Sequence, residues 1–176
     1  PTLSLFVALG DTNAGATSPT GVTWTAMTTP PTGTWLSMVW APSLAFFVAV
    51  GVSGVISTTA NGTSWTARTS GTTGTLRAIG WNGVKLVTVG AVGRQSLDGI
   101  NWSAAASIVW GGSYEMYGIA WTGEIWMVVG GRSPPPPNDP AIALARDGST
   151  WSKRFSPVGA GAEPTASAVI ADLVDV

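Results

Sequence analysis

The chain contains no cysteine and no histidine among its 176 residues. Their lack excludes disulfide bonds, zinc sites of the usual ligand type, and nucleophilic pairs of the Ser-His-Asp or Cys-His kind. The composition therefore favours a protein with no metal site and no cofactor.

Charged residues are also scarce, at 10% of the chain, with 8 Lys and Arg against 9 Asp and Glu. So few scattered cations cannot build the basic surface that a nucleic-acid-binding protein needs. Intrinsic disorder requires the opposite composition, with low hydrophobicity and high charge. No apolar run reaches the ~18–20 residues that span a membrane as a helix. We therefore predict no nucleic-acid partner and no membrane span.

Glycine, proline and tryptophan are abundant instead, with 23, 12 and 10 residues respectively, and 45% of the chain is hydrophobic. Heptads rich in Glu and Lys are missing, which excludes a coiled coil or a helical bundle. This composition favours a Trp-rich, all-β domain. Since the chain starts at Pro1 rather than Met, we expect either processing or a longer parent protein.

A short phrase recurs four times and ends each time in tryptophan. Its pattern is small-x-(Asp/Asn/Thr)-Gly-x-x-Trp. The four copies span Ser18–Trp24, Thr59–Trp65, Ser96–Trp102 and Ala145–Trp151. Asp-Gly and Asn-Gly are strong signals for a hairpin of type I′, in which both central residues have positive φ. We therefore expect each phrase to join two antiparallel strands, with the second strand starting at the Trp.

A second phrase precedes three of these copies and consists of two apolar runs separated by a turn. The first runs are Leu36–Trp40, Leu76–Trp81 and Met116–Trp121, and the second runs are Phe47–Gly51, Leu86–Gly90 and Trp126–Gly130. Together the two phrases give four short strands per unit. Spread over four units, 176 residues give 44 per unit, which is the size of a propeller blade. The predicted fold is an all-β propeller of four-stranded blades.

The two ends of the chain bear on ring closure. The first unit has its second strand at Leu5–Gly10 but no first strand, and Ala166–Ala171 is a candidate to supply it. A closed ring would remove the open sheet edges that favour aggregation. The predicted blades are then 1–34 with 166–176, 35–75, 76–115 and 116–165, in one domain spanning 1–176. The alternatives are a stretch of a larger propeller, or a propeller completed by two chains.

The Ser96–Trp102 phrase and its three relatives resemble the Asp-box, or BNR, repeat of sialidase-like propellers. The spacing is one residue shorter than the usual Ser-x-Asp-x-Gly-x-x-Trp. The fuller unit looks like repeats found in phage tail proteins, other virion proteins and some bacterial surface proteins. This resemblance covers nearly the whole chain and implies a fold more strongly than a function.

The repeated residues have a structural explanation. Short polar side chains accept backbone hydrogen bonds in turns, glycine supplies positive φ, and tryptophan buries a large ring, here expected against the next blade. In the resembled family these boxes lie away from the ligand face. We assign a structural role, in preference to calcium or sugar binding, to the repeat residues Trp24, Asn61, Trp65, Asp98, Gly99, Trp102, Asp147, Gly148 and Trp151.

The resemblance also raises the possibility of sialidase chemistry, which uses an arginine triad, a Tyr nucleophile with a Glu partner, and an acid/base Asp. The arginines at 68, 77, 94, 132, 146 and 154 do not occupy equivalent blade positions. Tyr114 and Glu115 are neighbours in sequence, so in a strand their side chains point to opposite faces. We therefore predict that the chain is not an enzyme and has no catalytic residues.

Binding is expected on the face that carries the longer loops. In a four-stranded blade, the loops between the second and third strands share one face with the connectors between blades, and function concentrates on such loops. Trp and Tyr beside Asp, Asn and Arg form a plausible contact set for a sugar or a protein. The candidate binding residues are Asp11, Asn13, Trp110, Tyr114, Glu115, Arg132, Asn138 and Asp139. The competing interpretation gives Trp110 a packing role and makes Pro134–Pro137 a stiff spacer.

These observations favour a non-enzymatic binding or structural module on a virion or an extracellular surface. It would be a phage tail-associated receptor-binding or glycan-binding protein, or a capsid decoration. Expected partners are other virion proteins, a host surface glycan, and further copies of the chain in a homo-oligomer. The alternatives are a sialidase-like glycan-active enzyme, or a fragment of one, and an assembly factor that uses the propeller for protein–protein contact.

Overall fold

The computed structural model describes residues 5–11, 13–105, 114–132, 140–148 and 150–155, and this part of the chain is all-β apart from one short 3₁₀ turn. The elements are β1 (Phe6–Leu9), β2 (Gly15–Ser18), β3 (Thr25–Ala26), β4 (Trp35–Ala41), β5 (Phe46–Gly51), η1 (Val52–Gly54), β6 (Ile56–Thr59), β7 (Thr66–Arg68), β8 (Leu76–Trp81), β9 (Leu86–Gly90), β10 (Arg94–Ser96), β11 (Ser103–Ala104), β12 (Tyr114–Trp121), β13 (Trp126–Arg132), β14 (Pro140–Ala145) and β15 (Ser152–Phe155). No helix of the described part is long and apolar enough to cross a membrane.

The strands form four antiparallel sheets that follow one another along the sequence. The first sheet is β1–β2–β3, and the second, third and fourth sheets are β4–β7, β8–β11 and β12–β15. Each sheet pairs its strands in chain order, as the predicted hairpins require. The first sheet begins with the strand equivalent to β5, so it lacks a counterpart of β4 in the described residues. Ala166–Ala171, the candidate for that strand, lies outside the described residues.

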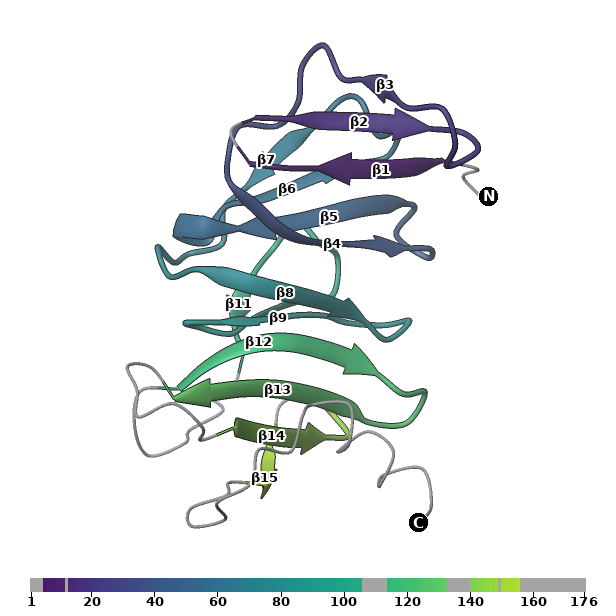
Figure 1. Cartoon of the computed structure of the whole chain (residues 1–176). Helices are drawn as coiled ribbons and strands as arrows, with labels where there is room; N and C mark the ends of the chain where they lie inside the picture. Colours follow the sequence, from purple (N-terminus) through teal and green to yellow (C-terminus); the bar gives the residue numbers. More distant parts are fainter. Residues whose placement is uncertain (1–4, 12, 106–113, 133–139, 149, 156–176) are drawn as a thin grey trace.

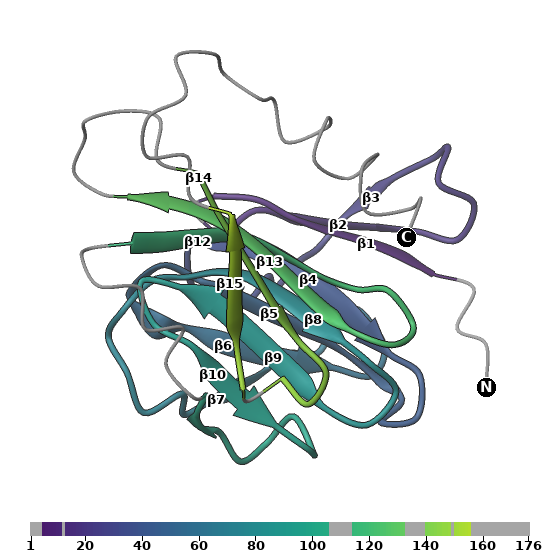
Figure 2. The ribbon, with the colours of Figure 1, turned by 90° about the horizontal axis from the view of Figure 1, so that it is seen from below.

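The four sheets stack face to face, with the first at one end and the fourth at the other (Figure 1). The first strands of three sheets lie side by side, with β8 between β4 and β12. Seen from below, the sheets fan around this inner edge (Figure 2). Apolar side chains fill the space between neighbouring sheets. One core cluster joins the second and third sheets through Val48, Leu76 and Leu86, and another joins the third and fourth through Val89 and Val128.

A β-bulge recurs where the first two strands of a sheet pair. One extra residue interrupts the register after Trp35, after Leu76 and after Met116. The glycine that ends the second strand lies opposite each bulge. A Cβ atom on Gly90 would lie 2.2 Å from the carbonyl oxygen of Thr75, and Gly51 and Gly130 have the same close approach to a backbone oxygen. The bulge therefore explains why each apolar run ends in glycine.

The hairpin turns differ in detail from the prediction. The glycines of the four Asp-Gly-type turns have φ between 67° and 79°, but the residues before them do not have positive φ, so the turns are not of type I′. The following strands begin one residue after the Trp, at Thr25, Thr66, Ser103 and Ser152. The connections are longer than two-residue hairpins because side-chain hydrogen bonds, described below, stabilise a wider loop.

We expect Gly90→Ala to lower the free energy of unfolding by roughly 1–3 kcal/mol or more, because the added methyl group meets a backbone oxygen that cannot move independently. Urea unfolding would measure the loss. Gly10 is the matched control, since it directly follows β1, the equivalent strand of the first sheet, and among the described residues an added Cβ there would meet only the Cβ of Ala14, at 3.7 Å. Equal losses in the two variants would contradict this account of the bulge.

Candidate functional site

The four repeated turns have similar patterns of side-chain to backbone hydrogen bonds. In the third sheet, the hydroxyl of Ser96 accepts hydrogen bonds from the N–H groups of Asp98 and Gly99, at 3.3 and 2.8 Å. The carboxylate of Asp98 accepts from the N–H groups of Ile100 and Asn101, at 2.9 and 2.8 Å. Thr59 and Asn61 do the same in the second sheet. In the first sheet Ser18 accepts the same two bonds, and Thr20 accepts one, from the N–H of Val22. The fourth turn has Ala145 at the first position and keeps the bond from Thr150 N–H to Asp147, at 2.7 Å.

Asp98 is a charged residue of these turns, and folding lowers its pKa. The backbone N–H of Asn101, then its side-chain amide, then the N–H of Ile100 hold the pKa of Asp98 well below its usual range, and burial opposes them only in part. The side-chain amide of Asn101 donates to the second carboxylate oxygen at 2.7 Å. Both carboxylate oxygens of Asp98 therefore accept hydrogen bonds within the turn, which supports the structural role assigned to this residue.

The turns of the second, third and fourth sheets contact the preceding sheet, whereas the tryptophan was expected to pack against the next one. The position of a Cβ on Gly62 lies 2.6 Å from Leu5 in the first sheet, and that on Gly99 lies 2.6 Å from Phe46 in the second. Trp102 packs against the core cluster between the second and third sheets, and Trp151 against the cluster between the third and fourth. In these sheets the turn and the tryptophan ring therefore both contact the preceding sheet.

The predicted binding residues of the first loop have partners within the chain. Asn13, with φ of 61°, accepts a hydrogen bond from Gly33 N–H at 3.0 Å, and Asp11 accepts one from the hydroxyl of Thr34 at 2.9 Å. These bonds join the β1–β2 loop to the connector before β4. Loops and connectors therefore do share one face, as the sequence predicts.

The remaining predicted binding residues differ in how much of each residue the structure describes. Glu115 lies at the start of β12 and accepts hydrogen bonds from two atoms of Arg77, from Nε at 3.0 Å and from Nη2 at 2.6 Å. Tyr114 and Arg132 pair across β12 and β13, and only their backbone is described. Trp110, Asn138 and Asp139 lie outside the described residues. Their binding role stays a prediction.

The bulges bring together a cluster that the sequence did not reveal. The extra residue of each bulge is Leu36, Arg77 or Tyr117; all three side chains are exposed or partly exposed, whereas the residue before each of them is buried. The guanidinium of Arg77 lies 5.1 Å from the ring centroid of Tyr117, within the range of a cation–π contact. We call these three residues, with Glu115, the bulge cluster. No sequence signal marked it, because a bulge does not change the apolar pattern of the strand.

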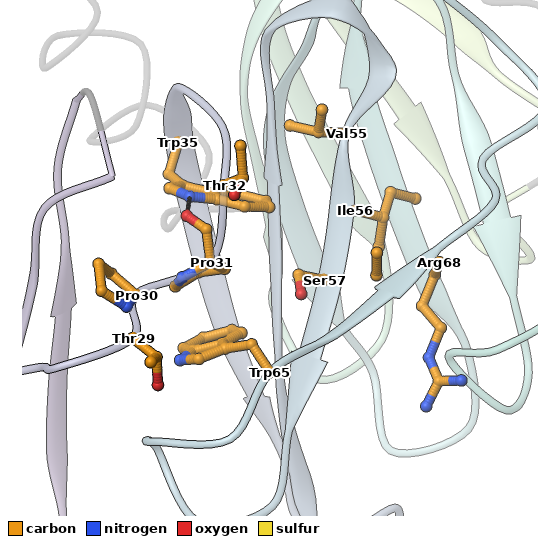
Figure 3. A pocket seen from close by; sticks show the side chains of 11 residues that line it. Thr29, Pro30, Pro31, Thr32, Trp35, Val55, Ile56, Ser57, Trp65 and Arg68 are labelled. Atoms are coloured by element: carbon orange, nitrogen blue, oxygen red, sulfur yellow. Dashed lines mark hydrogen bonds between the residues drawn. The ribbon is translucent and has the colours of Figure 1, made fainter.

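A cleft of about 440 Å³ lies between the β3–β4 connector and the outer strands of the second sheet. Figure 3 shows Pro30, Pro31 and Trp65 on one side of it and Arg68 on the other. Trp35 donates to the carbonyl of Pro31 at 3.0 Å and so fixes the connector beside the sheet. Ser57 and Ile56, both buried, lie between the two sides. We call this the Trp65 cleft.

Two side chains that line the Trp65 cleft, Trp65 and Arg68, carry N–H groups without a described hydrogen-bond partner. Trp24 and Trp102 donate from the indole to the glycine carbonyl of their own turn, at 3.1 Å, but the buried Nε1 of Trp65 has no partner among the described residues. Arg68 donates from Nε to the hydroxyl of Thr58 at 2.9 Å and makes no ion pair with a described carboxylate. N–H groups of both side chains therefore have no described partner, as is also true of the buried Nε of Arg94 and Nε1 of Trp126 and Trp151, which lie outside the cleft.

The described residues contain no group of three or more Asp and Glu that could hold a metal ion. The arginines with described side chains belong to different elements. Arg68 is on outer strand β7, Arg77 on inner strand β8, Arg94 on β10, and Arg146 follows β14. Each described contact of Arg68, Arg77 and Arg94 is with a different part of the chain.

No protein-family model matches the chain, and no curated protein matches it by sequence. Solved structures do match. A chain in the crystal structure of a nidogen/laminin complex aligns with a TM-score of 0.64 and 10% identity, over 88% of this chain and 62% of that one. Ycf48 from Cyanidioschyzon merolae aligns with a TM-score of 0.54 and 17% identity, over 70% and 41%. The computationally designed Ika8 protein aligns with a TM-score of 0.53 and 12% identity, over 84% and 48%.

The fold is that of a β-propeller. At these identities the similarity establishes the fold alone. The chain spans less than two thirds of the length of each of these three structures.

We expect Asp98→Ala to lower the free energy of unfolding by roughly 1–2 kcal/mol at neutral pH, because backbone N–H groups lose their acceptor. Asp98→Asn keeps an acceptor oxygen, as Asn61 does in the equivalent turn, and should cost less. Since folding lowers the pKa of Asp98, its carboxylate stabilises the fold above the unfolded pKa of about 3.9, and this contribution is lost as the pH falls through the folded value. The wild type should therefore lose stability relative to Asp98→Asn below about pH 4 in urea titrations. Parallel pH profiles would contradict this assignment.

The Arg77–Glu115 pair should contribute little to stability, because both side chains are partly exposed. A double-mutant cycle with Arg77→Gln and Glu115→Gln should give a coupling of about 0.2–1 kcal/mol that decreases with added salt. A coupling well above this range, insensitive to salt, would instead make the pair a structural requirement of the fold.

Proposed function

We propose that this chain is a non-enzymatic binding module that holds a glycan in the Trp65 cleft. One observation carries the proposal: the cleft combines a buried indole N–H that has no described partner with an arginine that no described carboxylate neutralises. A buried donor without a partner costs about 1–3 kcal/mol, which an acceptor on a ligand would recover. Sugars supply such acceptors in their hydroxyl, N-acetyl and carboxylate oxygens.

The shape and composition of the cleft support a sugar as the ligand. Its volume of about 440 Å³ lies in the range of small-molecule sites. Its lining mixes apolar surface, from Pro30, Pro31 and Ile56, with the polar groups of Ser57 and Arg68. Apolar surface suits the C–H faces of a pyranose, and the polar groups fix its orientation. An anionic sugar would gain a charge-assisted hydrogen bond from Arg68.

The setting that we propose is a virion or an extracellular surface, on a phage tail or as a capsid decoration, where host glycans and other virion proteins are the partners. This part of the proposal depends on the resemblance of the repeated phrase to virion repeats. The separation of the described arginines supports a binding role over a sialidase-like one, since that chemistry needs three arginines around one carboxylate.

Glycan binding can be tested with a panel of bacterial surface polysaccharides and sialylated oligosaccharides, followed by calorimetry on any that bind. Trp65→Phe removes the N–H donor and part of the ring system but keeps an aromatic ring, and should weaken binding about 3–10-fold, as should Arg68→Gln. Trp102→Phe and Arg146→Gln are the matched controls, because they make the same changes outside the cleft.

The outcomes separate the candidates. Affinities that change equally in the cleft variants and in the controls would overturn the assignment of the cleft. Release of cleaved sugar would overturn the non-enzymatic role and favour the sialidase-like alternative. No binding to the whole panel would favour protein–protein contact, for which the exposed Leu36 and Tyr117 of the bulge cluster are the specific support.

A further inference from the structure

The first sheet exposes a face that every other sheet buries. Phe6 is 54% exposed, whereas the residues at the same position of the repeat, Phe47, Leu86 and Trp126, are 9%, 0% and 0% exposed. In the fourth sheet this position faces the preceding sheet, because the ring of Trp126 lies over Gly80 of β8. Phe6 therefore occupies a core position of the repeat, but among the described residues no preceding sheet packs against it.

The turn of the first sheet shows the same deficiency. Gly62 and Gly99 lie against the preceding sheet, and Gly148 lies against Trp126 of its own sheet and Val87 of the preceding one, whereas the atoms nearest to a Cβ on Gly21 all belong to Phe6 of its own sheet. Trp24 is 43% exposed, although Trp65, Trp102 and Trp151 are partly buried. Val22, next to Gly21, is 84% exposed. We call Phe6, Gly21, Val22 and Trp24 the uncovered face.

The repeat itself defines what fits this face. In three sheets, the residue at one equivalent position of the repeat contacts the turn of the following sheet. Leu5 contacts the turn of Gly62, and Phe46 contacts the turn of Gly99. The third such residue, Lys85, donates to the carbonyl of Asp147 at 2.9 Å. The equivalent residue of the fourth sheet is Ile125, which is only partly buried, and Met127 follows it on the same face of β13. The fourth sheet therefore presents an apolar position of the kind that receives a turn.

The two matching faces lie at opposite ends of the stack of sheets (Figure 1). We propose that they bind each other between two copies of this chain, head to tail, with the uncovered face of one copy on Ile125 and Met127 of the other. Such a heterologous contact closes a ring if its rotation allows and otherwise continues as a filament. The contact repeats the packing already present three times within the chain, and both surfaces are apolar, so it needs no charged partner.

Two exposed positions provide a matched pair of variants for this proposal. Val22 and Ile100 both follow the turn glycine and are both exposed, but only Val22 belongs to the uncovered face. Light scattering coupled to size exclusion should show self-association of the wild type that depends on concentration. Val22→Asp should raise the dissociation constant at least tenfold, and Ile100→Asp should leave it unchanged. A monomer at every concentration, or equal effects of both variants, would overturn the proposal.

Cross-linking then tests the orientation of the two copies, and the natural lack of cysteine removes any background. A mixture of the Val22→Cys and Ile125→Cys single variants should form a heterodimer with a short bismaleimide, and neither variant should cross-link with itself. Ile100→Cys mixed with Ile125→Cys is the control and should remain monomeric. Cross-linked Val22→Cys homodimers would overturn the head-to-tail arrangement. A cross-link within a single chain carrying both Val22→Cys and Ile125→Cys would show that one chain closes on itself, which would also overturn the proposal.

Discussion

The packing of a turn against the preceding sheet is the contact on which the rest of the structure depends. A side chain in place of Gly62 or Gly99 would meet Leu5 or Phe46 of the preceding sheet at 2.6 Å, and one in place of Gly148 would meet Trp126 of its own sheet at 3.0 Å. A hydroxyl at the start of the turn and an amide or carboxylate two residues later satisfy the backbone N–H groups that this tight approach removes from water. The polar network thus permits a close apolar contact, and repeating it along the chain stacks the sheets.

The sequence predicted the strands well because their information is local. The turn phrase and the apolar runs each occupy fewer than ten residues, and antiparallel pairing in chain order follows directly from hairpins. The prediction that loops and connectors share one face is likewise a consequence of counting strands, and the bond from Thr34 to Asp11 agrees with it. The direction in which Trp102 and Trp151 pack was wrong because a strand pattern does not specify which neighbour a ring reaches.

The candidate site was much less predictable, because it depends on contacts between residues that are distant in sequence. Trp65 fits the repeat as a structural residue, and only the structure distinguishes its indole, without a described partner, from that of Trp102, whose N–H bonds to its own turn. Arg68 drew attention only for not matching a sialidase triad. The cleft exists because the connector with Pro30 and Pro31 crosses the outer strands, and no local pattern specifies where a connector lies.

The recurring bulge has a consequence for how this scaffold can change. It inserts one residue per inner strand whose side chain points away from the core, while the paired glycine keeps the backbone in register. Leucine, arginine and tyrosine occupy the three described positions, so the scaffold accepts apolar, cationic and aromatic groups there without altering its strands. Substitutions at these three positions should therefore change the surface of the second, third and fourth sheets without changing their strands.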